Sequence, residues 1–188
     1  IGDQWAELKS RLPYVVFDIE SDGDQIKEFA FRSADYTHYY EDEGQLDSLV
    51  QEINLKDIVV GHRIKQWDLN IIESHKNINP TFVWDTLEIE ILLNPCRYAC
   101  SLHTKHNAKD DTELTDRLFW NQLFRLSTNE ELCEQLKGFL PENIKIILNE
   151  LRQPNYSKFF KKSGGTEESF YQNLRDIDNS LIDELESI

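Results

Sequence analysis

Two acidic side chains stand within a strongly apolar stretch near the start of the chain. Residues 15–20 have the sequence VVFDIE, so Asp18 and Glu20 lie two residues apart in a segment rich in β-branched and aromatic residues. Such a segment is typical of a buried strand, and side chains two residues apart on a strand point to the same face. Because buried carboxylates need a counter-charge, we expect this pair to hold a metal ion.

The residues around this pair predict a run of strands. Residues 14–40 are rich in β-branched and aromatic side chains, with turn-forming residues at 21–24 and 33–35. This order is typical of three consecutive antiparallel strands. Apolar residues at helical spacing within residues 44–53 then predict a helix, and the apolar residues 57–61 predict a further strand.

The middle of the chain continues the alternation of helices and strands. We expect a helix at 68–75, a short strand at 82–84 and helices at about 86–93 and 111–126. Strands joined through helices in this order indicate an α/β fold, in which helices flank a mixed sheet.

Helix start signals dominate the rest of the chain. Ser127 and Glu130 have the spacing of a capping box, and Pro141 opens a helix that reaches about Arg152. Pro154 then interrupts the helical pattern, because proline cannot continue a helix from within.

We expect residues 1–126 to form the main domain and residues 127–188 a helical extension, with a link to a further domain as one option. Within the extension, residues 166–188 place apolar side chains at spacings of three and four, namely Phe170, Leu174, Ile177, Leu181, Leu185 and Ile188. A helix of this kind buries its apolar stripe on the preceding helices, in a dimer with a second copy, or against another domain.

Composition narrows the class of protein. The formal net charge of −15 disfavours tight non-specific binding of nucleic acid, because Lys and Arg supply most of that affinity. No stretch approaches the roughly 20 apolar residues of a membrane helix, and three cysteines are too few for a disulfide scaffold. We therefore expect a cytoplasmic protein without a membrane partner. The lack of Met, even at residue 1, is typical of a processed product or of an excerpt from a longer polypeptide.

Two further motifs add candidate site residues. His62 follows Gly61 at the end of a predicted strand, and Asp68 lies seven residues after that glycine. His106 precedes Asp111 by five residues, and Asp111 leads directly into an amphipathic helical pattern.

These four acids and one histidine, in this order, resemble the DEDD exonuclease superfamily in its histidine-containing branch, which includes proofreading subunits and RNase T. The resemblance covers about residues 12–126. It implies an RNase H-like fold and a 3′-to-5′ exonuclease, which hydrolyses phosphodiester bonds at DNA or RNA ends by a two-metal mechanism. It also implies a nucleic-acid partner with a 3′ end, and a fused or associated helicase or other nucleic-acid module.

The resemblance assigns a role to each of these residues. Asp18 bridges two ions, which are Mg²⁺ or Mn²⁺. Glu20 and Asp111 complete the ligands of the ion that activates water, and Asp68 holds the second ion directly or through water. His106 is the general base, and the ordinary histidine pKa of about 6.5 suits that task near neutral pH.

Substrate contacts are expected beside these motifs. The residues concerned are Ile19, His62, Arg63 and Lys105, with Lys65, Arg97 and Lys109 as further candidates for backbone phosphates. Arg63 stands where the family usually has Asn. Residues 156–162 interleave aromatic and lysine side chains, which is typical of a platform for single strands. The alternative is that Phe159 and Phe160 pack a linker onto the domain.

Three other interpretations are open, of which the second is compatible with a metal site. A zinc site would take Cys96, Cys100, His103 and His106, although the two residues between the ligand pairs leave little room for the chain to turn back. Asp68 is also a suitable N-cap for the helix that follows it. Finally, an RNase H-like domain without catalysis would serve as a nucleic-acid or protein binding module.

Overall fold

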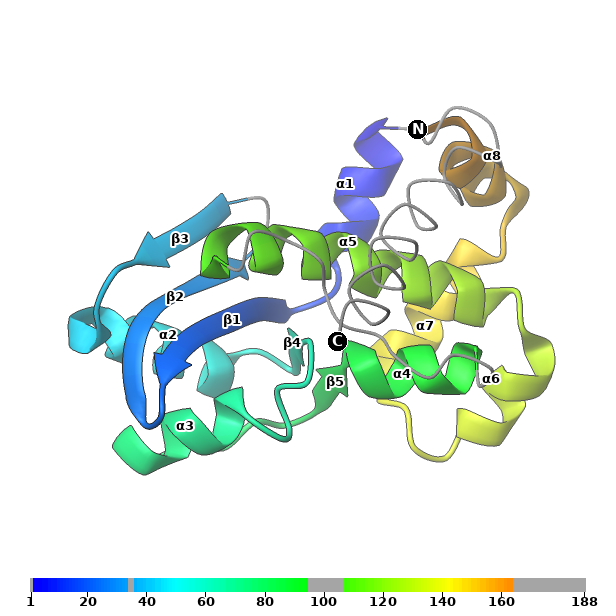
Figure 1. Ribbon diagram of the computed structural model, residues 1–188. Coiled ribbons are helices and arrows are strands. Elements are labelled where there is room, and N and C mark those ends of the chain that lie inside the picture. Colours follow the sequence, from blue (N-terminus) through cyan, green and yellow to red (C-terminus); the bar gives the residue numbers. More distant parts are fainter. Residues whose placement is uncertain (1, 34–35, 95–106, 164–188) are drawn as a thin grey trace, which may run out of the picture.

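The computed structural model describes residues 2–33, 36–94 and 107–163 (Figure 1). The predicted antiparallel strands are confirmed as β1 (Tyr14–Asp22), β2 (Gln25–Ser33) and β3 (Tyr36–Tyr40). Gly23 lies in the turn between β1 and β2 with a φ of +59°, a left-handed conformation that glycine adopts without a steric penalty.

Two parallel strands complete a five-stranded sheet in the order β3-β2-β1-β4-β5. A 3₁₀ turn (Glu43–Gln45) and α2 (Leu46–Leu55) lead from β3 to β4 (Ile58–Gly61), which pairs with β1. The helix α3 (Asp68–His75) then leads to β5 (Val83–Asp85) beside β4. The sequence prediction of an α/β fold with a mixed, RNase H-like sheet is therefore confirmed.

The remaining helices are α1 (Gly2–Ser10), α4 (Thr86–Leu93), α5 (Ala108–Ser127), α6 (Glu130–Leu136), α7 (Glu142–Leu151) and α8 (Pro154–Ser163). The sequence did not predict α1. It also misplaced the cap of α6, because α5 continues through Ser127, whose hydroxyl donates to the Phe124 carbonyl. Asn129 caps α6 instead and accepts from the Leu132 N–H. The helix α7 ends at Leu151, close to the predicted Arg152, and Pro154 begins α8.

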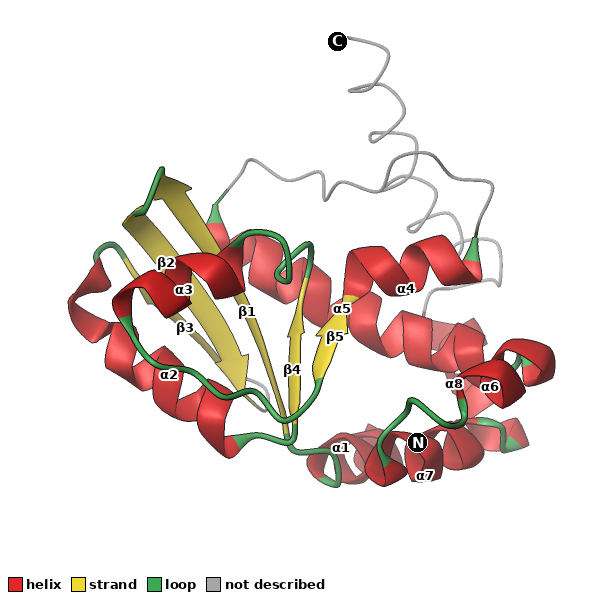
Figure 2. Ribbon diagram, turned by 90° about the horizontal axis from the view of Figure 1, so that it is seen from below, coloured by secondary structure: helices red, strands yellow, loops and turns green. Residues whose placement is uncertain are grey.

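The sheet is covered on both faces (Figure 2), and side chains alternate between two apolar clusters. Odd-numbered side chains of β1, such as Phe17 and Ile19, pack with those of α2 and α3. Even-numbered side chains, such as Tyr14 and Val16, pack with those of α5 and α7. Asp18 and Glu20 continue the even-numbered series, so the strand directs them toward the α5 side of the sheet.

The cluster on the α5 side also takes in residues from both ends of the described chain. Leu8 of α1, Leu148 of α7 and Tyr156 of α8 are buried in it. Tyr156 donates its hydroxyl to the Gln4 carbonyl at 3.5 Å, and Figure 1 shows α1 near α8. Tyr156 is therefore part of the core rather than of a platform for bases. Among the described helices, none combines the length and the apolar character of a membrane span.

Candidate metal centre

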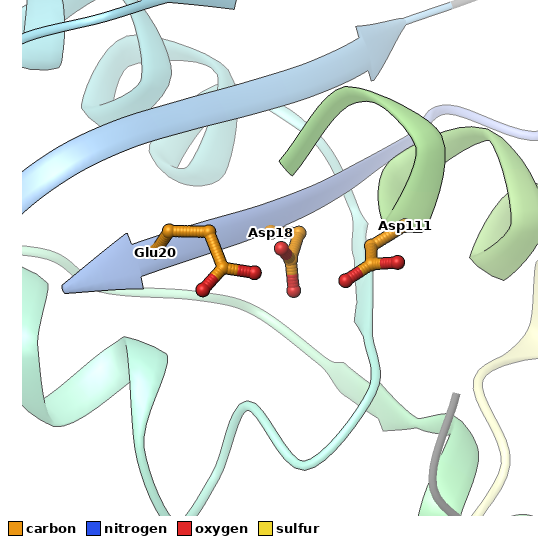
Figure 3. A group of neighbouring side chains, drawn as sticks. All are labelled: Asp18, Glu20 and Asp111. Atoms are coloured by element: carbon orange, nitrogen blue, oxygen red, sulfur yellow. The ribbon is translucent and has the colours of Figure 1, made fainter. Parts of the chain in front are cut away.

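Three carboxylates meet between β1 and the first turn of α5. One oxygen from each of Asp18, Glu20 and Asp111 lies within 4.8 Å of the others, and Figure 3 shows the three groups side by side in the same space. Asp18 and Glu20 come from the same face of β1, whereas Asp111 comes from α5. Residues far apart in the chain thus form one acidic group, and oxygen ligands of this kind are those that Mg²⁺ and Mn²⁺ prefer.

Asp68 lies outside this group of three but close enough to act on the charge of Asp18, and it comes from α3, which packs on the opposite face of the sheet. Strand β1 pairs with β4 only as far as Val16, so the later part of β1 is open on that side. There the Ile19 backbone N–H donates to the Asp68 carboxylate. The N-cap position of α3 belongs to Trp67, which makes no side-chain cap, and Asp68 is the first helical residue. The N-cap interpretation of Asp68 is therefore wrong, because its carboxylate faces the site.

Two of the carboxylates carry oxygens that protein groups leave unsatisfied. Asp18 Oδ2 and Asp68 Oδ2 are buried and have no hydrogen-bond partner. Buried polar atoms are normally paired, and an unpaired acceptor lowers the stability of the fold. Bound cations would give these oxygens partners, so the residues present fit the divalent ions that the sequence predicts.

The pKa shifts of the carboxylates also indicate a site that suits cations. Burial, followed by the charges of Asp68 and Asp111, raises the pKa of Asp18 well above its usual range. Burial also raises the pKa of Asp68 to about 7, against the opposing effect of the Ile19 N–H. Ionising several neighbouring buried carboxyl groups has a high free-energy cost, whereas divalent cations between them would favour the charged forms.

A tight loop presents Asp68, and Asp85 holds that loop in place. The Asp85 carboxylate accepts from the backbone N–H groups of Arg63 at 3.0 Å and Lys65 at 3.2 Å. It also caps α4 by accepting from the Leu87 N–H at 3.0 Å. Sequence reasoning missed this residue, although an Asp directly before the predicted helix at 86–93 is an N-cap signal.

The backbone of this loop explains two residues of the second motif. A Cβ on Gly61 would lie 2.1 Å from Ile64 Cγ2, so any larger residue would force the buried Ile64 side chain to move. Arg63 has a φ of +60° and is the one non-glycine residue with a positive φ in the described part of the chain. Asn tolerates this left-handed region better than Arg does, so Arg63 carries a conformational cost that Asn would lower.

The predicted substrate contacts lie in different environments. His62 Nδ1 is 2.8 Å from the Thr86 hydroxyl. The Arg63 side chain is exposed, and Lys65 pairs with Glu88 at 2.6 Å. The Ile19 side chain is buried in the core, so it meets the site only through its backbone.

Several predicted residues lie outside the described part of the chain. These are Cys96, Arg97, Cys100, His103, Lys105 and His106, together with residues 166–188. The general base, the zinc alternative and the interaction helix therefore stay predictions. The described chain resumes at Asn107, which caps α5 by accepting from the Asp110 N–H at 2.8 Å.

Neither a scan against protein-family models nor a search of curated proteins finds a match for this chain.

Proposed function

We propose that this protein is a metal-dependent 3′-to-5′ exonuclease, which hydrolyses phosphodiester bonds at DNA or RNA ends. One observation carries the proposal: Asp18, Glu20 and Asp111 meet within 4.8 Å on an RNase H-like sheet. The buried, unpaired oxygens of Asp18 and Asp68 support it, because they suit cations better than they suit a metal-free core.

Each carboxylate has a proposed task in this site. Asp18 lies between the other acids and would contact both ions, Glu20 and Asp111 would hold the first, and Asp68 would hold the second. Two bound Mg²⁺ or Mn²⁺ ions would supply an activated water and neutralise charge on the phosphate. We assign the removal of the water proton to His106, which directly precedes the N-cap residue Asn107 in the sequence.

The partner in this proposal is the 3′ end of a nucleic acid. The net charge of −15 opposes binding along a duplex, so recognition would depend on the metal centre and on a few nearby basic side chains. We propose the cytoplasm as the compartment, because reducing conditions preserve free thiols such as that of Cys133.

The test is the shortening of 5′-labelled DNA and RNA strands, single-stranded or with a 3′ overhang. We expect stepwise removal from the 3′ end with Mg²⁺ or Mn²⁺ and none with a chelator. Asp18→Asn should abolish the reaction, since a neutral amide cannot replace a bridging carboxylate. Asp22→Asn is the matched control, because Asp22 ends the same strand but is exposed and pairs with Lys27.

Two results would contradict the proposal. Shortening that persists in chelator, or in Asp18→Asn, would rule out the metal mechanism. Binding of the strands without shortening under any metal condition would instead support a binding module without catalysis.

A further inference from the structure

Glu28 of β2 lies directly across from Glu20 in the β1–β2 pair. Like charges opposite each other on neighbouring strands destabilise a sheet, so Glu28 needs compensating contacts. Both of its oxygens have them. Oε1 accepts from the Ala108 N–H at 2.8 Å, and Oε2 accepts from the Tyr39 hydroxyl at 2.6 Å.

The contact with Ala108 is made at the first residue of α5. The N–H groups of the first helical turn have no partner within the helix, and the Asn107 cap takes only that of Asp110. Glu28 satisfies the N–H of Ala108 from another element, and its negative charge suits the positive end of the helix. Asp111 lies three residues further along the same turn.

The contact of Glu28 is the first of three between α5 and β2, which we call the α5–β2 contact series. Its members are Ala108 with Glu28 at 2.8 Å, Thr112 with the Ala30 carbonyl at 3.3 Å, and Asp116 with Arg32 at 2.9 Å. Each step advances four residues on the helix and two on the strand. The series therefore fixes how far along the sheet α5 lies.

We propose that Glu28 is a positioning residue for the metal centre: by holding the first turn of α5 on β2, it sets the place of Asp111 relative to Asp18. This inference rests on the proposed function, because it concerns the same site. Glu28 acts through hydrogen bonds rather than as a ligand, since both of its oxygens are engaged and it lies outside the group of three close carboxylates.

The test compares Glu28→Ala with Glu28→Gln. Both variants remove the charge, so a difference between them reports the contacts of the side chain, chiefly its two hydrogen bonds, rather than the charge. Gln can still accept from the Ala108 N–H and can donate to the Tyr39 oxygen. We expect Mn²⁺ binding, measured by titration calorimetry, to weaken about 10- to 100-fold in Glu28→Ala relative to Glu28→Gln, the range typical of residues that orient metal ligands.

A second measurement does not depend on metal. Amide hydrogen exchange in chelator should be faster at residues 108–111 in Glu28→Ala than in Glu28→Gln. Asp116→Ala is the matched control, because Asp116 also ties α5 to β2 but lies about two helical turns beyond Ala108. It should lower the unfolding midpoint and leave Mn²⁺ affinity within about threefold of that of the unchanged protein.

Equal Mn²⁺ affinity and equal exchange in the two Glu28 variants would overturn the inference, even if the protein is a nuclease. Conversely, a protein that binds Mn²⁺ and shows the expected difference, but does not shorten nucleic acid, would overturn the proposed function and leave the role of Glu28 intact.

Discussion

At the scale of single residues, Asp18 and Asp68 of the candidate metal centre oppose folding when no cation is bound. Asp68 shows the sign of the effect, because its pKa rises from the usual 3.8 to about 7 in the folded chain. A carboxyl group whose pKa is raised by folding makes its full contribution to stability only at a pH below its pKa in the unfolded chain. That contribution is lost as the pH rises through about 7.

We therefore expect Asp68→Asn to be more stable than the unchanged protein in chelator at pH 8, by on the order of 1–3 kcal/mol. The difference should shrink at pH 5, where the folded carboxyl is protonated already. Urea unfolding at both pH values measures it. Saturating Mg²⁺ should stabilise the unchanged protein more than the variant. An equal increase in the free energy of unfolding of both proteins would contradict the assignment of Asp68 to a metal.

Arg63 is a second residue that lowers the stability of the fold, in this case through its backbone conformation. Its φ of +60° is costly for a residue with a Cβ. Arg63→Gly should raise the free energy of unfolding by about 0.5–1 kcal/mol, because glycine adopts this conformation freely. The matched control is Gln66→Gly in the same exposed loop, where φ is not positive and glycine should destabilise the fold. Thermal unfolding of both variants measures the two effects. A loss of stability in both would show that the backbone at Arg63 is not strained.

At the scale of elements, the sequence predicted those parts of the fold that depend on local patterns. The turn at Gly23 and the alternation along β1 involve neighbouring residues, so the strands and most helices were predicted close to their observed bounds. Contacts between distant elements left no such pattern. Glu28 contacts Ala108 and Asp85 contacts Arg63 only through the tertiary arrangement of the sheet and its helices. Similarly, Leu8 of α1 is buried by residues of α5 and α7.

The loop between β4 and α3 allows an element-scale prediction. Asp85→Ala leaves the N–H groups of Arg63, Lys65 and Leu87 without their acceptor. We expect a loss of about 2–4 kcal/mol in the free energy of unfolding, together with weaker Mn²⁺ binding because Asp68 follows this loop.

The control for that prediction is Asn129→Ala, which removes the N-cap of α6 away from the sheet. It should cost about 1 kcal/mol and leave Mn²⁺ binding unchanged. Chemical denaturation and calorimetric titration measure the two effects. Unchanged Mn²⁺ binding in a folded Asp85→Ala protein would show that the loop does not position Asp68.

At the scale of the whole molecule, the described core spans the sheet and the helical extension together. The cluster on the α5 side runs in sequence from Leu8 to Tyr156 and joins α1, α5, α7 and α8. Figure 1 shows the later part of α5 reaching beyond the sheet toward α6 and α7. The helical extension therefore shares a core with the part of the fold that carries the candidate metal centre.

Because the described cluster already joins residues from Leu8 to Tyr156, we expect a chain truncated after Gly165 to keep its unfolding midpoint and the proposed activity on short oligonucleotides. Circular dichroism and the strand-shortening assay measure the two. A folded truncated protein that no longer shortens strands would indicate that the final residues help to form the substrate site.

The α5–β2 contact series also determines which changes in chain length the site can tolerate. Four helical residues rise about 6 Å and two strand residues about 6.6 Å, so the contacts stay matched over three steps. A single residue inserted between Asp111 and Thr112 would turn the first part of α5 by about 100° relative to the rest. If the contacts of Thr112 and Asp116 with β2 were kept, Asp111 would then turn away from Asp18, and Ala108 would lose its contact with Glu28. Insertions and deletions should therefore be excluded from residues 108–116 and 28–32, whereas the surface loops can vary in length.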